Sequence, residues 1–133
     1  MPNIVQKINP PTLPDAPSMG YSQISVCEPG KLVFISGQVA WQPDGSPVPD
    51  DLIDQATIAM GNVIKALEAV EAGPENITSI RMYIVNPALD DFMRVAPALS
   101  SYMGETIPTF TALGVTNLGG EGLKIELEAT AVV

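Results

Sequence analysis

The clearest pattern of apolar and polar positions lies near the end of the chain, in the run 123–131. Its odd-numbered residues are apolar and its even-numbered residues are polar or charged. A period of two predicts a strand with one face on a core and the other in water. Glu126 and Glu128 therefore point away from the core. A second extended run, 107–112, precedes this strand, and we expect the two strands to form one wall of a ligand site.

Two segments carry the three-and-four spacing of apolar residues that predicts helices. The first covers 51–72: Asp50 or Asp51 can cap it, Gly73 and the proline after it end it, and Gly61 in its middle indicates close packing. The second covers 89–103, and Pro97 inside it should kink or split it. Its expected inner stripe consists of Leu89, Phe92, Met93, Ala96, Leu99 and Met103.

The remaining segments predict strands. The runs 22–28 and 31–38 flank Pro29-Gly30, which indicates a hairpin, and 77–85 and 109–116 are further strands. The proline-rich start, 1–20, is typical of an extended arm with one edge strand at 4–7. The order β-β-α-β-α-β-β predicts a single α+β domain, 1–133, with a mixed sheet and both helices on one face.

The other face of that sheet is expected to be too apolar to remain bare. Its expected side chains are Tyr21, Phe34 or Ile35, Tyr83 and Phe110. Other copies of the chain can cover such a face, so we expect a closed oligomer with sites in the clefts between subunits.

Composition excludes several classes of function. The net charge is −9, which disfavours nucleic-acid binding, and the absence of histidine removes histidine-based catalysis and ordinary zinc sites. No run is long and apolar enough for a membrane span, and the start lacks the layout of a signal peptide, so we expect a cytoplasmic protein. We also expect no metal or other cofactor. The lone Cys27 excludes an internal disulfide and is expected to be buried.

Four residues are candidates for chemistry, each with a structural alternative. Tyr21 offers a hydroxyl and a flat ring, or is a packed aromatic residue. Gly37 lets a ligand approach the backbone, with the Ser36 hydroxyl beside it, or marks a bulge at a strand end. Glu126 is a candidate general acid/base that subunit contact could keep protonated near neutrality, or a solvated glutamate paired with Lys124.

An ordered set of short motifs resembles the Rid family, also called YjgF-like or endoribonuclease L-PSP. The set is Gly20-Tyr21-Ser22-Gln23, Ile35-Ser36-Gly37-Gln38, Asp54-Gln55, Asp91-Phe92, Ile107-Pro108 and Lys124-Ile125-Glu126-Leu127-Glu128-Ala129. The resemblance covers essentially the whole chain. It implies a chorismate-mutase-like fold, a homotrimer, and hydrolysis of reactive enamines and imines in three intersubunit clefts. It also implies that Tyr21, Ser36 and Glu126 match the tyrosine, serine and water-activating glutamate of the archetype.

The chain departs from the family pattern where the archetype binds the substrate carboxylate. Phe110 stands in place of the arginine, Ala112 in place of the cysteine and Ala96 in place of an asparagine, while Arg94 lies on another face of its helix. Losing a bidentate arginine–carboxylate pair costs about 1.5–3 kcal/mol and removes the substrate's anchor. The resemblance therefore implies a neutral or cationic ligand, flat or apolar, rather than 2-aminoacrylate.

Two functions remain open at this point. The first is hydrolysis or tautomerisation of a small imine, enamine or related ligand, with Glu126 as acid/base and Tyr21 and Ser36 as hydrogen-bonding groups. The second is a non-catalytic module that binds a metabolite or supports a partner enzyme. In both, the expected ligand-binding residues are Gly37, Trp41, Thr109, Phe110 and Thr111.

Overall fold

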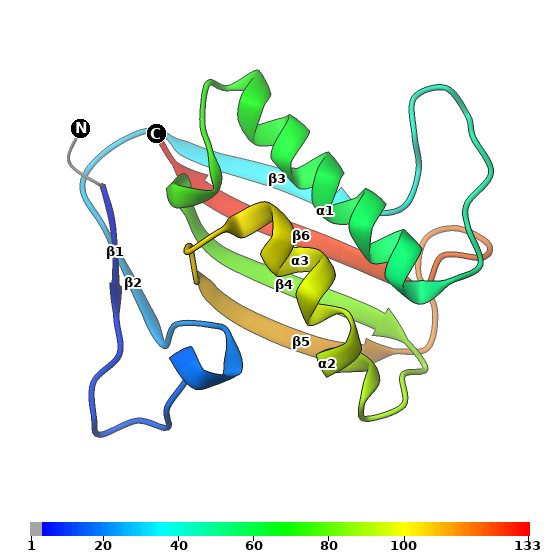
Figure 1. Ribbon diagram of the computed structural model, residues 1–133. Helices are drawn as coiled ribbons and strands as arrows, with labels where there is room; N and C mark the ends of the chain where they lie inside the picture. Colours follow the sequence, from blue (N-terminus) through cyan, green and yellow to red (C-terminus); the bar gives the residue numbers. More distant parts are fainter. Residues whose placement is uncertain (1–3) are drawn as a thin grey trace.

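A computed structural model describes residues 4–133 as an α+β fold in which helices cover one face of a four-stranded sheet (Figure 1). The elements are β1 (Val5–Ile8), η1 (Pro17–Met19), β2 (Ile24–Cys27), β3 (Leu32–Gln38), α1 (Leu52–Ala69), η2 (Pro74–Asn76), β4 (Ile77–Val85), α2 (Asp91–Arg94), α3 (Ala96–Met103), β5 (Thr109–Val115) and β6 (Ile125–Val132). The predicted fold class is confirmed.

The four-stranded sheet has the order β3-β6-β4-β5, and β6 runs antiparallel to both of its neighbours. Strands β4 and β5 pair in parallel, so the sheet is mixed, as expected. Its core face carries alternate residues such as Ile80, Met82, Ile125 and Leu127, which pack against α1 and α3. Glu126 and Glu128 alternate with these buried residues and therefore lie on the opposite face, here called the outer face.

Helix α1 confirms the first helical prediction. The side chain of Asp51 accepts a hydrogen bond from the backbone N–H of Asp54 at 3.0 Å, which caps the first turn. Gly61 marks close packing, because a Cβ there would lie 3.1 Å from the hydroxyl oxygen of Tyr102 on α3. A larger residue at this position would displace the hydroxyl end of the Tyr102 side chain.

The second predicted helix is split at the expected place. Helix α2 ends at Arg94, and α3 begins at Ala96 with Pro97 in its first turn, where a missing N–H costs nothing. The expected inner stripe is correct for Leu99 and Met103 but wrong for Leu89, which is 89% exposed. The stripe is also wrong for Met93, which lies in α2 before the break and is exposed.

The predicted hairpin around Pro29-Gly30 is wrong. Strand β2 pairs with β1 in a separate two-stranded arm, and β3 pairs with β6 (Figure 1). The chain at this turn packs on its own C-terminus: the N–H of Lys31 donates to the carbonyl of Val133, and the N–H of Val133 donates back. The edge strand expected at 4–7 is confirmed as β1, whereas Cys27, expected to be buried, is exposed at the end of β2.

The outer face carries only part of the expected apolar set. Phe34 is 76% exposed, and Tyr83 stands opposite Glu126 on β4, so both lie there as predicted. Ile35 is buried in the helix-covered core instead. Phe110 is a second correction, because it packs against the core instead of lying on the outer face. In the parallel β4–β5 register it stands beside Ile80, so both side chains point to the core face.

Candidate functional site

A cavity of about 680 Å³ lies on the helix-covered side of the sheet, where β5, α2, α3 and the segment after η1 meet. Its lining residues are Ser18, Met19, Gly20, Tyr21, Met82, Phe92, Met93, Val95, Ala96, Pro97, Leu99, Ser100, Met103, Gly104, Thr106, Ile107, Phe110 and Ala112. Within residues 4–133, every lining side chain is uncharged. The volume suits a small organic molecule.

Tyr21 reaches the cavity because the chain turns sharply before it. Gly20 closes η1 in the left-handed region at φ 89°, a conformation that favours glycine. Beyond the tyrosine, Ser22 is buried, and its N–H donates to the carbonyl of Pro108 at 2.9 Å. The residue before Tyr21 and the residue after it are thus both fixed, which places the ring beside the start of β5.

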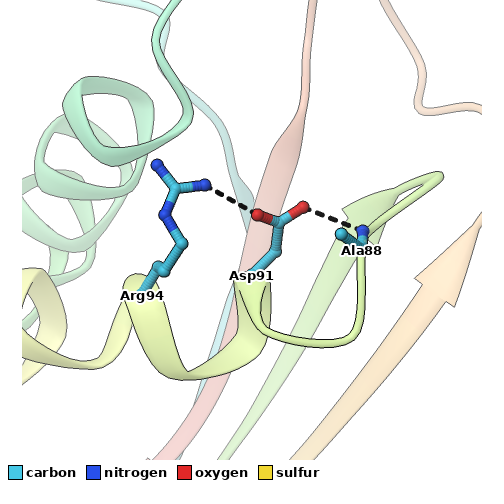
Figure 2. Close-up of polar contacts among 3 residues, drawn as sticks. All are labelled: Ala88, Asp91 and Arg94. Carbon is cyan, nitrogen blue, oxygen red and sulfur yellow. Dashed lines mark hydrogen bonds and ion pairs between the residues drawn. The ribbon is translucent and has the colours of Figure 1, made fainter.

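The arginine nearest to this cavity in the sequence is held elsewhere. Figure 2 shows Asp91 between two partners: its carboxylate pairs with the Arg94 guanidinium at 2.7 Å and accepts from the N–H of Ala88 at 2.9 Å. Arg94 does not line the cavity. The Asp91–Arg94 pair therefore stabilises the turn into α2 and supplies no cation to the positions of Ala96, Phe110 and Ala112.

Glu126 and Gly37 lie together on the outer face. The β3–β6 register shifts between Ile35 and Gln38, which marks a bulge around Gly37. A Cβ at Gly37 would lie 1.9 Å from a carboxylate oxygen of Glu126, so only glycine leaves room for this side chain. Ser36 is exposed on the same bulge, and its carbonyl accepts from the side-chain amide of Gln38 at 3.0 Å.

The charges around Glu126 are mostly negative. Arg81 pairs with Glu128 at 3.6 Å, and the hydroxyl of Tyr83 donates to Glu128 at 3.3 Å. Desolvation by burial raises the pKa of Tyr83, and the charges of Glu128 and Glu126 raise it further. Lys124, the expected partner of Glu126, donates from its ammonium group to the carbonyl of Asp50 instead.

Three further predicted ligand residues lie outside the cavity lining. Thr109 donates its hydroxyl to the carbonyl of Thr78 at 2.8 Å, which ties β5 to β4. Thr111 stands opposite Arg81 on the outer face. Trp41 is 55% exposed in the loop after β3, and a Cβ on Gly120 would lie 2.7 Å from its ring.

The structure therefore divides the predicted site into two groups on opposite faces of one sheet. Tyr21 and Phe110 line the cavity, together with the alanines at 96 and 112. Glu126, Gly37 and Ser36 lie at the β3–β6 pair. Within one chain, the strands of Phe110 and Glu126 do not form a common wall, because β4 separates β5 from β6 and the two side chains face opposite ways. The expected wall of a site between subunits stays a prediction.

Sequence reasoning missed the methionines of the cavity. The chain has six methionines, and four of them, Met19, Met82, Met93 and Met103, line this space. Methionine is flexible and polarizable, and it adapts to ligands of varied shape. The signal was the unusual number of methionines, although three of these four were assigned only to a core strand or a helix stripe. Within the described residues, no group of three or more histidine, cysteine, aspartate or glutamate side chains is placed to hold a metal ion, and no helix is long and apolar enough to cross a membrane.

Comparisons with known proteins agree with this architecture. Residues 13–133 match the family model described as Endoribonuclease L-PSP. The chain is 32% identical over 102 residues to the RutC family protein YjgH of Escherichia coli K12, which covers 75% of this chain and 76% of that protein. It is 29% identical over 105 residues to the 2-iminobutanoate/2-iminopropanoate deaminase of the same organism, covering 77% and 80% of the two chains.

Solved structures with more than a quarter of residues identical share the fold. The Rid protein YyfB from Yersinia pestis, of unknown function, superposes with a TM-score of 0.91 at 29% identity, covering 98% of this chain and 99% of that chain. TdcF from E. coli with bound serine gives a TM-score of 0.70 at 29% identity, covering 85% and 87%.

Proposed function

Because the chain belongs to the Rid (endoribonuclease L-PSP) family, we propose that it hydrolyses a small imine, enamine or related neutral ligand in a cleft shared by two copies. The single observation that carries this proposal is the placement of Glu126. Its carboxylate occupies space that only a glycine at position 37 leaves open, beside a bulge with an exposed serine. A carboxylate on a strand, rather than on a loop, has a fixed position from which to activate water.

The proposed reaction needs one group that can both accept and donate a proton. Glu126 takes a proton from water as the water oxygen bonds to the imine carbon, and the imine nitrogen receives a proton. The resulting carbinolamine loses ammonia when its C–N bond breaks and a carbonyl forms. Tyr21 and Ser36 serve as hydrogen-bonding groups, and the backbone at Gly37 anchors the ligand. General acid/base catalysis of this kind contributes roughly 10²–10⁴-fold to a rate.

The sheet geometry supports the proposal of a second copy. Within one chain, the cavity of Tyr21 and Phe110 and the carboxylate of Glu126 lie on opposite faces. The outer face exposes Phe34 and Leu113, which suits burial against another copy. We propose a homotrimer in which the outer face of one subunit closes the cavity of the next. Thr111 and Trp41 then contribute to the rim, whereas the hydroxyl of Thr109 is already engaged.

A second candidate function rests on the uncharged cavity. If the replacements at Phe110, Ala112 and Ala96 abolished turnover, the same space would serve a non-catalytic module that binds a neutral metabolite or supports a partner enzyme. The apolar and aromatic lining favours binding in either case.

The test compares two neighbouring glutamates of β6. Imines are generated in situ by an oxidase, and their hydrolysis is followed by ammonia release with and without the protein. We expect Glu126→Gln to lose about 10²-fold or more of the acceleration, whereas Glu128→Gln, which removes the partner of Arg81 and Tyr83, retains most of it. Equal rates for Glu126→Gln and wild type would remove this residue from the mechanism, and no acceleration by wild type would favour the binding module.

A further inference from the structure

We propose that the substrate is an imine without a carboxylate, carrying an apolar side chain of about the size of a phenyl ring. The reaction that supplies it is then the two-electron oxidation of a primary amine rather than of an amino acid. This inference rests on the proposed function, since it names the substrate class of that same site.

The first observation is the position of every cation in the chain. There are six lysines and arginines, and none of them lines the cavity. Four of the six already have partners: Lys7 donates to the carbonyl of Ile77, Arg81 pairs with Glu128, Arg94 pairs with Asp91, and Lys124 donates to the carbonyl of Asp50. A substrate carboxylate would lose its hydration there without gaining a counter-charge.

The second observation concerns the face that we propose closes the cavity. Around Glu126 it carries Glu128 and Tyr83, and its cation, Arg81, is paired with Glu128. A neighbouring copy would therefore bring net negative charge to the cleft, on a protein whose net charge is already −9. Such a field repels anions and attracts cations. A protonated imine without a carboxylate is a cation, and Glu126 is its natural counter-charge.

The third observation is the surface that would hold the side chain of the substrate. Phe92, Phe110 and Tyr21 supply rings, and Met19, Met82 and Met93 supply flexible thioethers around the same space. Methionine sulfur packs favourably against aromatic rings, and aromatic side chains pair edge to face or offset. A ring or a branched alkyl chain fits this lining better than the short chain of a small imino acid.

The chemistry balances over two steps. An amine R–CH₂–NH₂ loses two electrons and two protons to the oxidised flavin of an amine oxidase or amine dehydrogenase, which gives R–CH=NH. Water then adds to the imine carbon, the nitrogen is protonated, and the C–N bond breaks, giving R–CHO and NH₃. The protein contributes to the second step only. Its role is to convert a reactive imine rapidly into an aldehyde and ammonia.

The test uses two imines that differ only in the carboxylate. A monoamine oxidase generates the imine of 2-phenylethylamine, and an L-amino-acid oxidase generates the imine of phenylalanine, each with catalase. The rate of ammonia release from each imine is measured with and without the protein. We expect acceleration of the amine-derived imine to exceed that of the imino acid by about tenfold or more. Equal or reversed preference would overturn the substrate class while leaving hydrolysis itself established.

A binding measurement separates the substrate class from catalysis. If neither imine is hydrolysed faster, the proposed hydrolysis fails, and titration calorimetry with phenylacetamide and phenylacetate decides the ligand class. Binding of the neutral amide with exclusion of the acid supports the inference; equal or tighter binding of the acid, or binding of neither, overturns it. Phe110→Arg should shift the preference toward the carboxylated partner of each pair, whereas Phe110→Leu, which adds no charge, should not.

Discussion

The two faces of the central sheet offer opposite chemistry. The helix-covered face opens into a cavity lined by rings, thioethers and small residues, with no charged side chain among its described lining. The outer face carries Glu126, Glu128 and Arg81 on neighbouring strands, with the hydroxyl of Tyr83 between them. One face is suited to hold an apolar molecule, and the other is suited to move a proton.

This difference is the reason for proposing that two copies of the chain form the site together. Side chains alternate along a strand, so Phe110 and Glu126 keep to opposite faces as long as the β5–β4–β6 register holds. No side-chain rotation can bring them together through a packed sheet. A second copy that places its outer face on the cavity unites the two kinds of group, and the predictions below test that arrangement.

The largest expected effect comes from mixing two inactive variants. Glu126→Gln removes the proton-transfer group, and Ala112→Trp fills the cavity from β5, so each should lose about 10²-fold or more of the hydrolytic rate. If each site combines the cavity of one copy with the glutamate of another, a mixed trimer contains one cleft with both halves intact. Doubly tagged mixed assemblies should then recover about one-third of the wild-type rate.

The matched control mixes two variants that damage the same half. Glu126→Gln and Gly37→Ala both disturb the outer face, so their mixed assemblies should recover nothing. Complementation would be refuted if Glu126→Gln and Ala112→Trp also failed to recover activity while mass spectrometry of the native assembly showed both chains in one oligomer.

Gly37→Ala should separate activity from stability. Its new Cβ would lie 1.9 Å from one carboxylate oxygen of Glu126, and the end of this flexible side chain must move away. We expect roughly a tenfold to hundredfold loss of hydrolytic rate, because displacing a catalytic group by about 1 Å has such an effect. Chemical denaturation should show little change.

Gly119→Ala provides the control for Gly37→Ala. No atom lies within 4 Å of a Cβ at this position, which belongs to the loop before β6. This variant replaces a glycine without creating a steric clash, so its hydrolytic rate should match that of wild type. Equal losses in both variants would show that the close approach of Glu126 to Gly37 has no catalytic role.

Much of the secondary structure could be predicted from local pattern, because period and breakers act over short distances. The alternation in 123–131, the cap at Asp51 and the break near Pro97 all reappear in the structure. The partner of β3 could not be predicted in this way. Pro29-Gly30 fits a hairpin locally, but β6 offers β3 a longer antiparallel partner, and β1 takes β2. Pairing between distant strands is decided by the whole sheet.

The candidate site also has features that could be predicted from the sequence and features that depend on the pairing of distant strands. Family resemblance predicted Tyr21, Ser36 and Glu126 as site residues, and these roles stay predictions. Period two placed Glu126 correctly on the outer face. The face of Phe110 depends on its parallel register with β4, which no local pattern encodes. For the same reason the cavity methionines were missed, since they come from four separate segments of the chain.

Replacing Gln55 should have a large effect on stability, because this side chain ties the start of α1 to the loop before β6. It is fully buried at the start of α1, donates to the carbonyls of Pro49 and Gly122, and accepts from the N–H of Lys124. These bonds fix the loop that leads into β6. Gln55→Glu keeps the shape but loses both donated bonds and buries a carboxyl group, so we expect unfolding to become easier by about 2–3 kcal/mol.

The measurement for Gln55 is urea denaturation at constant protein concentration, since assembly contributes to stability. Asn62→Asp is the comparison, because Asn62 also holds a loop by donating to the carbonyls of Val39 and Trp41 but is only partly buried. The loss of unfolding free energy in Asn62→Asp should be smaller than in Gln55→Glu. A larger loss for Asn62→Asp would show that the loop after β3, and not the entry to β6, limits the stability of the fold.

The smallest expected effect lies in the arm, which belongs to neither face of the site. Burial lowers the pKa of Lys7 from 10.5 to about 8, and an electrostatic interaction with the nearby Cys27 opposes this shift. Between pH 8 and 10.5, the unfolded chain holds a proton that the folded chain has released, so raising the pH favours the folded state. Below pH 8 both states are protonated, and the folded state bears the cost of a partly buried charge.

Lys7→Met should therefore flatten part of the pH dependence of stability. In urea denaturation, the free energy of unfolding of wild type should rise from pH 7 to pH 9.5 relative to that of Lys7→Met. Lys65→Met changes the charge in the same way at an exposed position, so its pH dependence should follow that of wild type. The ammonium of Lys7 also donates to the carbonyl of Ile77 and to the hydroxyl of Ser25, so its replacement adds a constant loss at both pH values. A difference between wild type and Lys7→Met that stays constant from pH 7 to 9.5 would contradict the lowered pKa. Hydrolytic activity should be unchanged in Lys7→Met, because no residue of β1 or β2 lines the cavity and neither strand pairs with β6.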